Sequence, residues 1–135
     1  MTKPSRWGVM LMLIGAFATS AAPRIASAKP DVAAKAQARV DAAAAVYASE
    51  DAQWRAGRAT IESVCAWSVR WLDAQRDQPS KGKALKDALA AHLARVQAIA
   101  TEADAQVKAG RASHADADVA AYYVAEAELW VARGK

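Results

Sequence analysis

The chain has 135 residues, of which 54% are hydrophobic, and a formal net charge of +4. This length allows one small domain. Three basic residues, Lys3, Arg6 and Arg24, precede residue 29, and the remainder carries 15 Lys and Arg against 14 Asp and Glu. A nearly neutral chain without a basic cluster argues against a nucleic-acid-binding protein.

The N-terminal segment has the order of residues found in secretory signal peptides. A basic start is followed by the apolar run WGVMLMLIGAFAT (7–19) and by Ala26-Ser27-Ala28, an A-x-A sequence. The run of 13 residues is too short to span a bilayer as a helix. We therefore expect a signal peptide over 1–28 and a periplasmic or secreted chain over 29–135, without a transmembrane segment. An uncleaved N-terminal anchor is the alternative.

Alanine makes up roughly 30% of residues 29–135 and is the best helix former. The helix breakers are few and divide the chain into four segments that we expect to be helical, at about 31–56, 60–77, 83–109 and 113–133. No segment alternates apolar and polar residues as a strand would. Gly57 and Gly110 stand where the end of a helix favours positive φ. Residues of N-cap type precede the four segments: Asp31, Thr60, Ser80 and Ser113.

Large apolar residues recur at helical spacing in each segment. In the first, Val40, Tyr47 and Trp54 lie seven residues apart. We interpret the Trp and Tyr residues as core and inter-helix packing, with an aromatic ligand pocket as the alternative. The stripes of the other three segments comprise Ile61, Val64, Cys65, Trp67, Trp71 and Leu72; Leu85, Leu89, Leu93, Val96, Ile99 and Val107; and Val119, Tyr122, Tyr123, Leu129 and Trp130.

One ten-residue sequence occurs twice. DAQWRAGRAT (51–60) and DAQVKAGRAS (104–113) differ at three positions, and each reads as a helix end, a tight turn and a new N-cap. The repeat predicts an all-α protein made of two tandem antiparallel helical hairpins with coiled-coil-like packing. The hairpins are expected at about 31–77 and 83–133, joined by a polar connector over 78–82, with both repeated turns at the same end.

The turn sequences GRATIESVC (57–65) and GRASHADAD (110–118), with AEAELWVA (125–132) in the helix after the second, resemble the periplasmic hairpin tips of the TolC family of outer membrane efflux proteins. The resemblance covers the helical part of the chain only. It implies that the turns meet hairpin tips of adaptor proteins, but it does not imply a pore formed by this chain alone. The residues that fit the family pattern are Gly57, Arg58, Thr60, Val64, Gly110, Arg111, Ser113 and Asp116, and those that depart from it are Ser63, Ala117 and Asp118.

The functional expectation is an exported, non-enzymatic module that binds an envelope protein or a second copy of itself. We find no catalytic constellation and no cofactor motif. The alternative is a periplasmic chaperone-like or ligand-binding protein with an apolar groove between its hairpins. Candidate docking residues are Gly57, Arg58, Thr60, Gly110, Arg111 and Ser113.

Three further side-chain groups have two possible roles each. His114, Asp116 and Asp118 could hold a metal ion, but Ser113 and Asp116 also fit a helix cap, which we favour. His92, at the border of its stripe, is expected to be a half-buried packing residue, with a ligand role as the alternative. The single cysteine, Cys65, is expected to be buried and inert, with an intermolecular bond as the alternative.

Overall fold

The computed structural model describes residues 31–79 and 82–134. Within these ranges the chain forms four helices and no strand: α1 (Val32–Arg55), α2 (Ile61–Arg76), α3 (Lys83–Lys108) and α4 (His114–Arg133). The predicted all-α class is confirmed, and each helix begins and ends within one residue of its expected bounds. The expected signal peptide lies outside the described residues. The N-cap expected at Ser80 was wrong, because α3 begins at Lys83 and has Gly82 as its N-cap, without a side-chain hydrogen bond.

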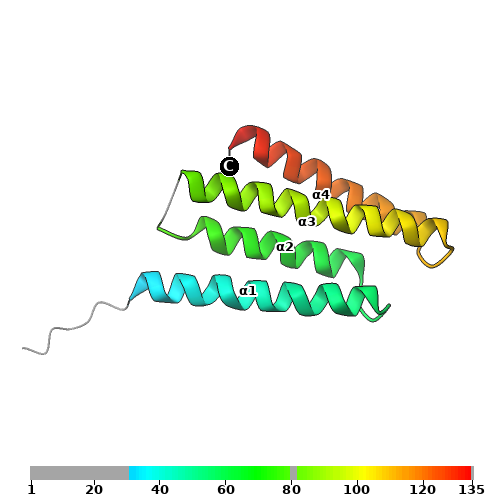
Figure 1. The fold of residues 1–135 in the computed structure, drawn as a ribbon, viewed down its shortest axis with the longest axis horizontal. Coiled ribbons are helices and arrows are strands. Elements are labelled where there is room, and N and C mark those ends of the chain that lie inside the picture. Colours follow the sequence, from blue (N-terminus) through cyan, green and yellow to red (C-terminus); the bar gives the residue numbers. More distant parts are fainter. Residues whose placement is uncertain (1–30, 80–81, 135) are drawn as a thin grey trace, which may run out of the picture.

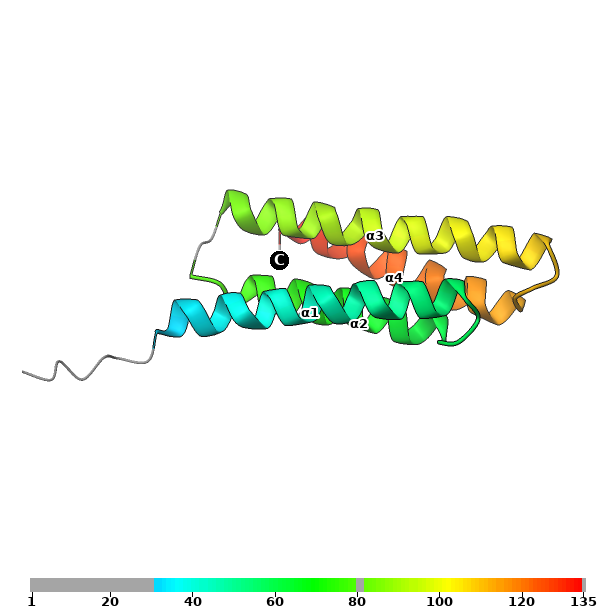
Figure 2. The same cartoon turned by 60° about the horizontal axis from the view of Figure 1, so that its bottom comes forward.

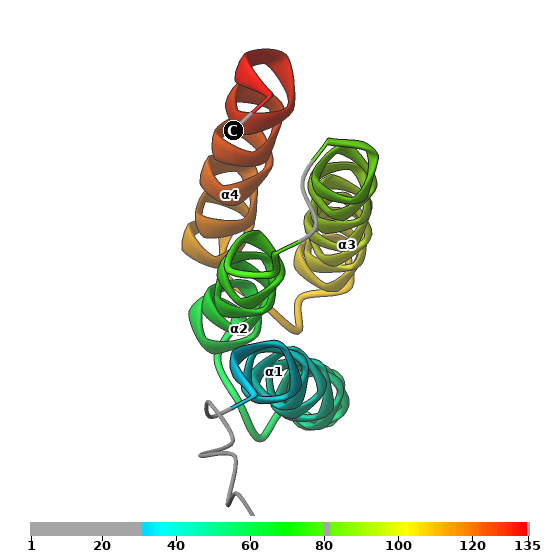
Figure 3. The ribbon, with the colours of Figure 1, turned by 90° about the vertical axis from the view of Figure 1, so that its left-hand side faces the viewer.

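The four helices run along one long axis (Figure 1), and the chain reverses direction at each connection. Both short turns, between α1 and α2 and between α3 and α4, lie at the same end of the molecule. Figure 2 shows the opposite end, where α2 leads to α3. Viewed along the bundle (Figure 3), α2 lies between α1 and the pair formed by α3 and α4. Accordingly, α2 packs against all three other helices, whereas the backbone of α1 packs against α2 alone.

The repeated sequences fold into the same local structure. After α1, the Gly57 N–H donates to Trp54 O at 2.8 Å and the Arg58 N–H donates to Gln53 O at 2.8 Å. After α3, Gly110 and Arg111 donate to Val107 O and Gln106 O at 2.9 and 2.8 Å. These pairs of bonds form a Schellman motif, which satisfies the last carbonyls of a helix and requires a left-handed residue. Glycine fills that position in both turns, with φ of 70° at Gly57 and 68° at Gly110.

Replacing either turn glycine by alanine should lower the free energy of unfolding by about 1 kcal/mol. A Cβ atom at Gly57 or Gly110 would meet no atom within 4 Å, so the cost comes from the positive φ and not from a clash. Urea unfolding followed by circular dichroism measures the change. Gly134→Ala is the control: this glycine also has positive φ but only ends the last helix, which can fray without loss of packing. Equal, negligible effects at all three glycines would contradict the turn assignment.

Two clusters of buried residues form the core. The one nearer the turns joins all four helices and contains Trp54, Ile61, Val64, Cys65, Ile99, Ala103 and Ala120. The other, toward the connector, contains Leu72, Ala88 and Leu89, with Leu85 and Trp130 packed against it. Cys65 is buried and free, as expected, and burial raises the pKa of its thiol to about 12. A thiol that is shielded and protonated at neutral pH is a poor nucleophile.

The buried face of α4 differs from the stripe expected from its large residues. Tyr122 and Leu129 are 61% and 45% exposed, whereas Ala120 and Ala127 are completely buried. Small residues let α4 approach its neighbours closely, so the alanines, seven residues apart, occupy the contact face. The tyrosine and leucine are left on the outer face. The expectation that they belong to the core was wrong, because large side chains are not the only ones that mark a packed face in an alanine-rich helix.

Candidate functional site

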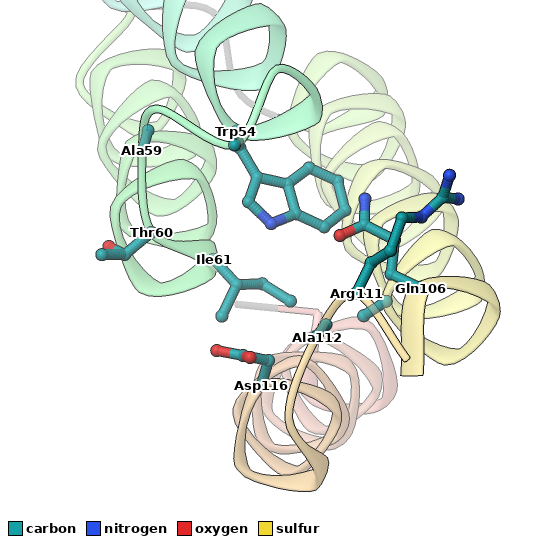
Figure 4. Close-up of a pocket in the computed structure, with 10 residues that line it drawn as sticks. Trp54, Ala59, Thr60, Ile61, Gln106, Arg111, Ala112 and Asp116 are labelled. Atoms are coloured by element: carbon teal, nitrogen blue, oxygen red, sulfur yellow. The ribbon is translucent and has the colours of Figure 1, made fainter. Parts of the chain in front are cut away.

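A hollow of about 220 Å³ lies between the two repeated turns. Its floor is Trp54, which extends from the end of α1 toward α3 and α4 (Figure 4) and is only 7% exposed. Ile61, at the start of α2, and Ala112, just before α4, line it from two sides. A second hollow of about 310 Å³ adjoins it and shares Trp54, Gly57, Gln106 and Arg111. The turn end therefore carries an indented surface with an apolar floor.

Charged side chains surround this surface. Arg55 lies over the Trp54 ring at 5.6 Å and is held by two carboxylates, Asp51 at 3.0 Å and Glu102 at 3.7 Å. The hydrogen bond that Arg55 donates to Asp51 raises the pKa of Arg55. Arg58 and Arg111 are exposed, and neither forms an ion pair within the described residues. The turn end thus presents two cations that no carboxylate of this part of the chain neutralises.

The N-caps of α2 and α4 use the predicted residues. The Thr60 hydroxyl accepts from the Ser63 N–H at 3.1 Å. At α4, the Ser113 hydroxyl accepts from the Asp116 N–H at 3.2 Å, and Asp116 Oδ2 accepts from the Ser113 N–H at 2.9 Å. This reciprocal arrangement is a capping box. Hydrogen bonds from Ser113 hold the pKa of the Asp116 carboxyl below its usual range.

One of the three side chains considered as metal ligands in the sequence belongs to the capping box. Asp116 is committed to Ser113, while His114 and Asp118 are exposed on the first turns of α4. In the described ranges, no three His, Cys, Asp or Glu side chains lie together in an arrangement that could hold a metal ion. The capping interpretation of Ser113 and Asp116 is the one that the geometry supports.

Only some of the predicted docking residues line the hollow. Gly57, Thr60 and Arg111 line the hollow, whereas Arg58, Gly110 and Ser113 lie beside it. The sequence reasoning missed the residues that give the hollow its shape. The sequence did contain a signal for one of them, because Trp54 occupies one of the three positions at which the two repeated sequences differ. The lining residues absent from the predicted docking set are Trp54, Ala59, Ile61, Ala103, Gln106, Ala112 and Asp116.

A buried polar cluster lies nearer the connector. Arg95 Nε donates to Ser68 Oγ at 2.9 Å, and Ser68 Oγ lies 2.9 Å from His92 Nδ1. The guanidinium can only donate, so Ser68 Oγ accepts from Arg95, and the direction of the hydrogen bond between Ser68 and His92 is set by the tautomer of the imidazole. The Arg95 guanidinium also lies over the Trp71 ring at 4.0 Å. His92 stacks on Trp130 with ring centroids 5.6 Å apart.

His92 is a packing residue, as expected, but it is completely buried where half-burial was expected. It faces α2 and α4 at once, and its Nδ1 has a hydrogen-bond partner in Ser68, whereas its buried Nε2 has none in the described residues. Burial, with the Arg95 and Arg76 charges, lowers the pKa of His92 to about 4, so the ring is neutral at pH 7. Burial also lowers the pKa of Arg95 to about 10, which leaves it charged at neutral pH.

The serine and histidine of this cluster do not form a nucleophilic pair that substrate could reach. Ser68 is completely buried, as is His92. The third member, Arg95, is a cation, whereas a catalytic histidine is held by a carboxylate or an equivalent acceptor that stabilises its charged form. We therefore assign the cluster to packing between α2 and α3.

No helix in the part of the chain that the structure describes is both long enough and apolar enough to cross a membrane. No family model, no curated protein and no solved structure matches the chain.

Proposed function

We propose that this chain is an exported, non-enzymatic protein-interaction module that docks an envelope protein through its two repeated turns. One observation carries the proposal: both turns lie at the same end of the bundle, and each exposes an arginine without an ion pair in the described residues. Exposed arginines contribute little to the stability of a single chain. At an interface, however, a guanidinium makes bidentate, charge-assisted contacts with carboxylates.

The module is built from two tandem antiparallel hairpins that arose by duplication and pack in a coiled-coil-like manner. The matching Schellman motifs and N-caps of the two turns support this origin. The resemblance of both turns to the hairpin tips of TolC-type proteins supports a docking role in the envelope, with an adaptor-like helical protein or a second copy as the partner. The signal-peptide-like order of residues 1–28 supports export, with Lys29 as the first residue of the mature chain.

The double variant Arg58→Ala with Arg111→Ala tests the docking role. Both side chains are exposed, so the circular dichroism spectrum and melting midpoint should stay close to those of the wild type. Capture of a specific partner from an envelope extract should fall, and the difference from the wild type should be larger at low salt, where charges are less screened. The control is Arg133→Ala, which removes an exposed arginine from the end of α4, at the other end of the bundle.

Two outcomes would contradict the docking role. A double variant that melts much earlier would show that the arginines are structural. A variant that folds normally and captures the same partner as well as the wild type would show that the repeated sequences serve only as turns.

A second candidate function, binding of unfolded clients or of an apolar ligand, rests on a different surface. α1 meets α3 through side chains and not through backbone packing, and a hollow of about 330 Å³ opens there at the connector end. Another hollow of about 370 Å³ lies between α1 and α2 beside Val46 and Trp67. Capture of many unfolded proteins, in place of one stoichiometric partner, would favour this function over docking.

A further inference from the structure

The two repeated turns have nearly the same sequence but unequal surroundings. Position 54, in the first copy, is tryptophan, and its counterpart in the second copy is Val107. The Trp54 indole reaches toward α3, packs on Ala103 and Ile99, and forms the floor of both hollows at the turn end (Figure 4). Both turns line these hollows, and Arg111 is the turn arginine that lines both of them.

The arginines at this end are also unequal. Arg58 lines neither hollow. Arg55 lines one of them but is already held by Asp51 and Glu102. Arg111 alone among the three combines a place in both hollows with the lack of an ion pair in the described residues.

The carboxylates nearby are engaged in other contacts. Asp116 Oδ2 accepts from both the backbone and the hydroxyl of Ser113, at 2.9 and 2.7 Å. Glu102 lies 3.7 Å from Arg55. The charge that Arg111 brings to the hollows is therefore left for a carboxylate from outside, and a guanidinium binds a carboxylate in a bidentate, directional manner.

The size of the first hollow limits what can enter. At about 220 Å³ it holds roughly seven waters at their share of liquid volume, which suits one aliphatic side chain and is too small for a helix. Trp54, Ile61 and Ala112 supply apolar walls for such a side chain. Burial of an anchor residue in a pocket, with polar contacts around it, is the usual arrangement of a binding hot spot.

We propose that the paired hollows at the turn end receive an acidic segment of the partner protein. One apolar side chain of this segment enters the hollow over Trp54, and a neighbouring carboxylate binds Arg111. This assignment rests on the proposed docking function and adds the chemistry of the partner. It also makes the two repeated turns functionally unequal, because Arg111 binds the segment and Arg58 does not.

Two short peptides test the chemistry directly: acetyl-Glu-Leu-Glu-amide and acetyl-Gln-Leu-Gln-amide. We expect the acidic peptide to shift the NMR signals of the Trp54 indole N–H and the Arg111 Nε–H. The uncharged peptide should bind at least about tenfold more weakly, as expected for the loss of a charge-assisted contact. Arg111→Ala should abolish this preference, and Arg58→Ala, the matched control from the other copy of the repeat, should keep it. Equal binding of both peptides, equal effects of both variants, or shifts confined to another surface would overturn the assignment.

A photo-cross-linking amino acid in the chain separates this assignment from the docking function. It is placed either at Ala109, exposed beside the second turn, or at Ala84, exposed at the connector end. Cross-links to an envelope protein from Ala109 that are lowered more by Arg111→Ala than by Arg58→Ala support both proposals. Cross-links from Ala109 that Arg111→Ala leaves unchanged overturn the acidic-segment assignment while docking stands. Cross-links from Ala84 alone, or from neither position, overturn docking at the turns.

Discussion

Acidification from pH 6.5 to pH 4 should lower the free energy of unfolding by up to about 3 kcal/mol through His92 alone. The imidazole is completely buried, and this burial is the largest cause of its lowered pKa. From α2, the hydrogen bond with Ser68 acts the other way and raises the pKa, while Arg76 contributes a positive charge that lowers it. From its own helix, Arg95 contributes another, and from α4 the Trp130 ring covers the imidazole. A proton on this histidine would therefore be a third, buried positive charge.

The direction of the effect follows from the two states of the histidine. The unfolded chain takes up a proton near the ordinary pKa of 6.5, whereas in the folded protein the pKa is about 4. Between these values the unfolded state binds more protons, so lowering the pH favours unfolding. Above pH 6.5 the contribution of His92 to stability is fully present, and below pH 4 this group causes no further loss.

Urea unfolding at a series of pH values measures the effect, with His92→Gln as the test variant. Glutamine keeps a polar group beside Ser68 but does not titrate, so the variant should lose less stability than the wild type between pH 6.5 and pH 4. His114→Gln, which removes the other histidine of the chain from an exposed position, should behave as the wild type. NMR titration of the His92 ring gives a direct readout even if the variant folds poorly. A midpoint near 6.5 in the folded protein would contradict the prediction.

The helices and their ends could be predicted from the sequence because their signals are local. Thr60 and Ser113 cap helices through bonds to residues three positions away, and Gly57 and Gly110 end helices through their own φ. Tyr47 and Trp54 could also be placed on the inner face of α1, since helical spacing alone relates them. Such features depend on neighbours within one or two turns of the chain.

The polar cluster and the hollow could not be predicted, because each depends on which helices meet. Ser68 and His92 are 24 residues apart, and nothing in either segment indicates that the other supplies its partner. The candidate docking residues were chosen because they occupy matching positions in the two copies of the repeat. The repeat gives no reason to distinguish one turn from the other. The inequality between Arg58 and Arg111 appears only when Trp54, from α1, is placed beside the turn between α3 and α4.

Trp54→Ala should lower the free energy of unfolding by about 3–5 kcal/mol, the usual cost of removing a buried tryptophan. Trp54 is the largest side chain of the core cluster at the turn end, and it packs with Ile61, Ile99 and Ala103. Because the backbone of α1 packs on α2 alone, this indole is a main link between α1 and the helices α3 and α4. The alanine-rich helices around it cannot collapse into the space without losing contacts of their own.

The repeat supplies a matched control for this substitution. Val107 occupies the equivalent position in the second copy but is only half-buried, so Val107→Ala should cost about 1 kcal/mol. Trp54→Leu keeps part of the apolar volume, so its cost in free energy of unfolding should lie between those of the two alanine variants. It also gives a measurable value if Trp54→Ala is too unstable to fold. Urea unfolding followed by far-ultraviolet circular dichroism gives all three values. Similar costs for Trp54→Ala and Val107→Ala would mean that the two copies of the repeat support the bundle equally, and that the indole does not join α1 to α3 and α4.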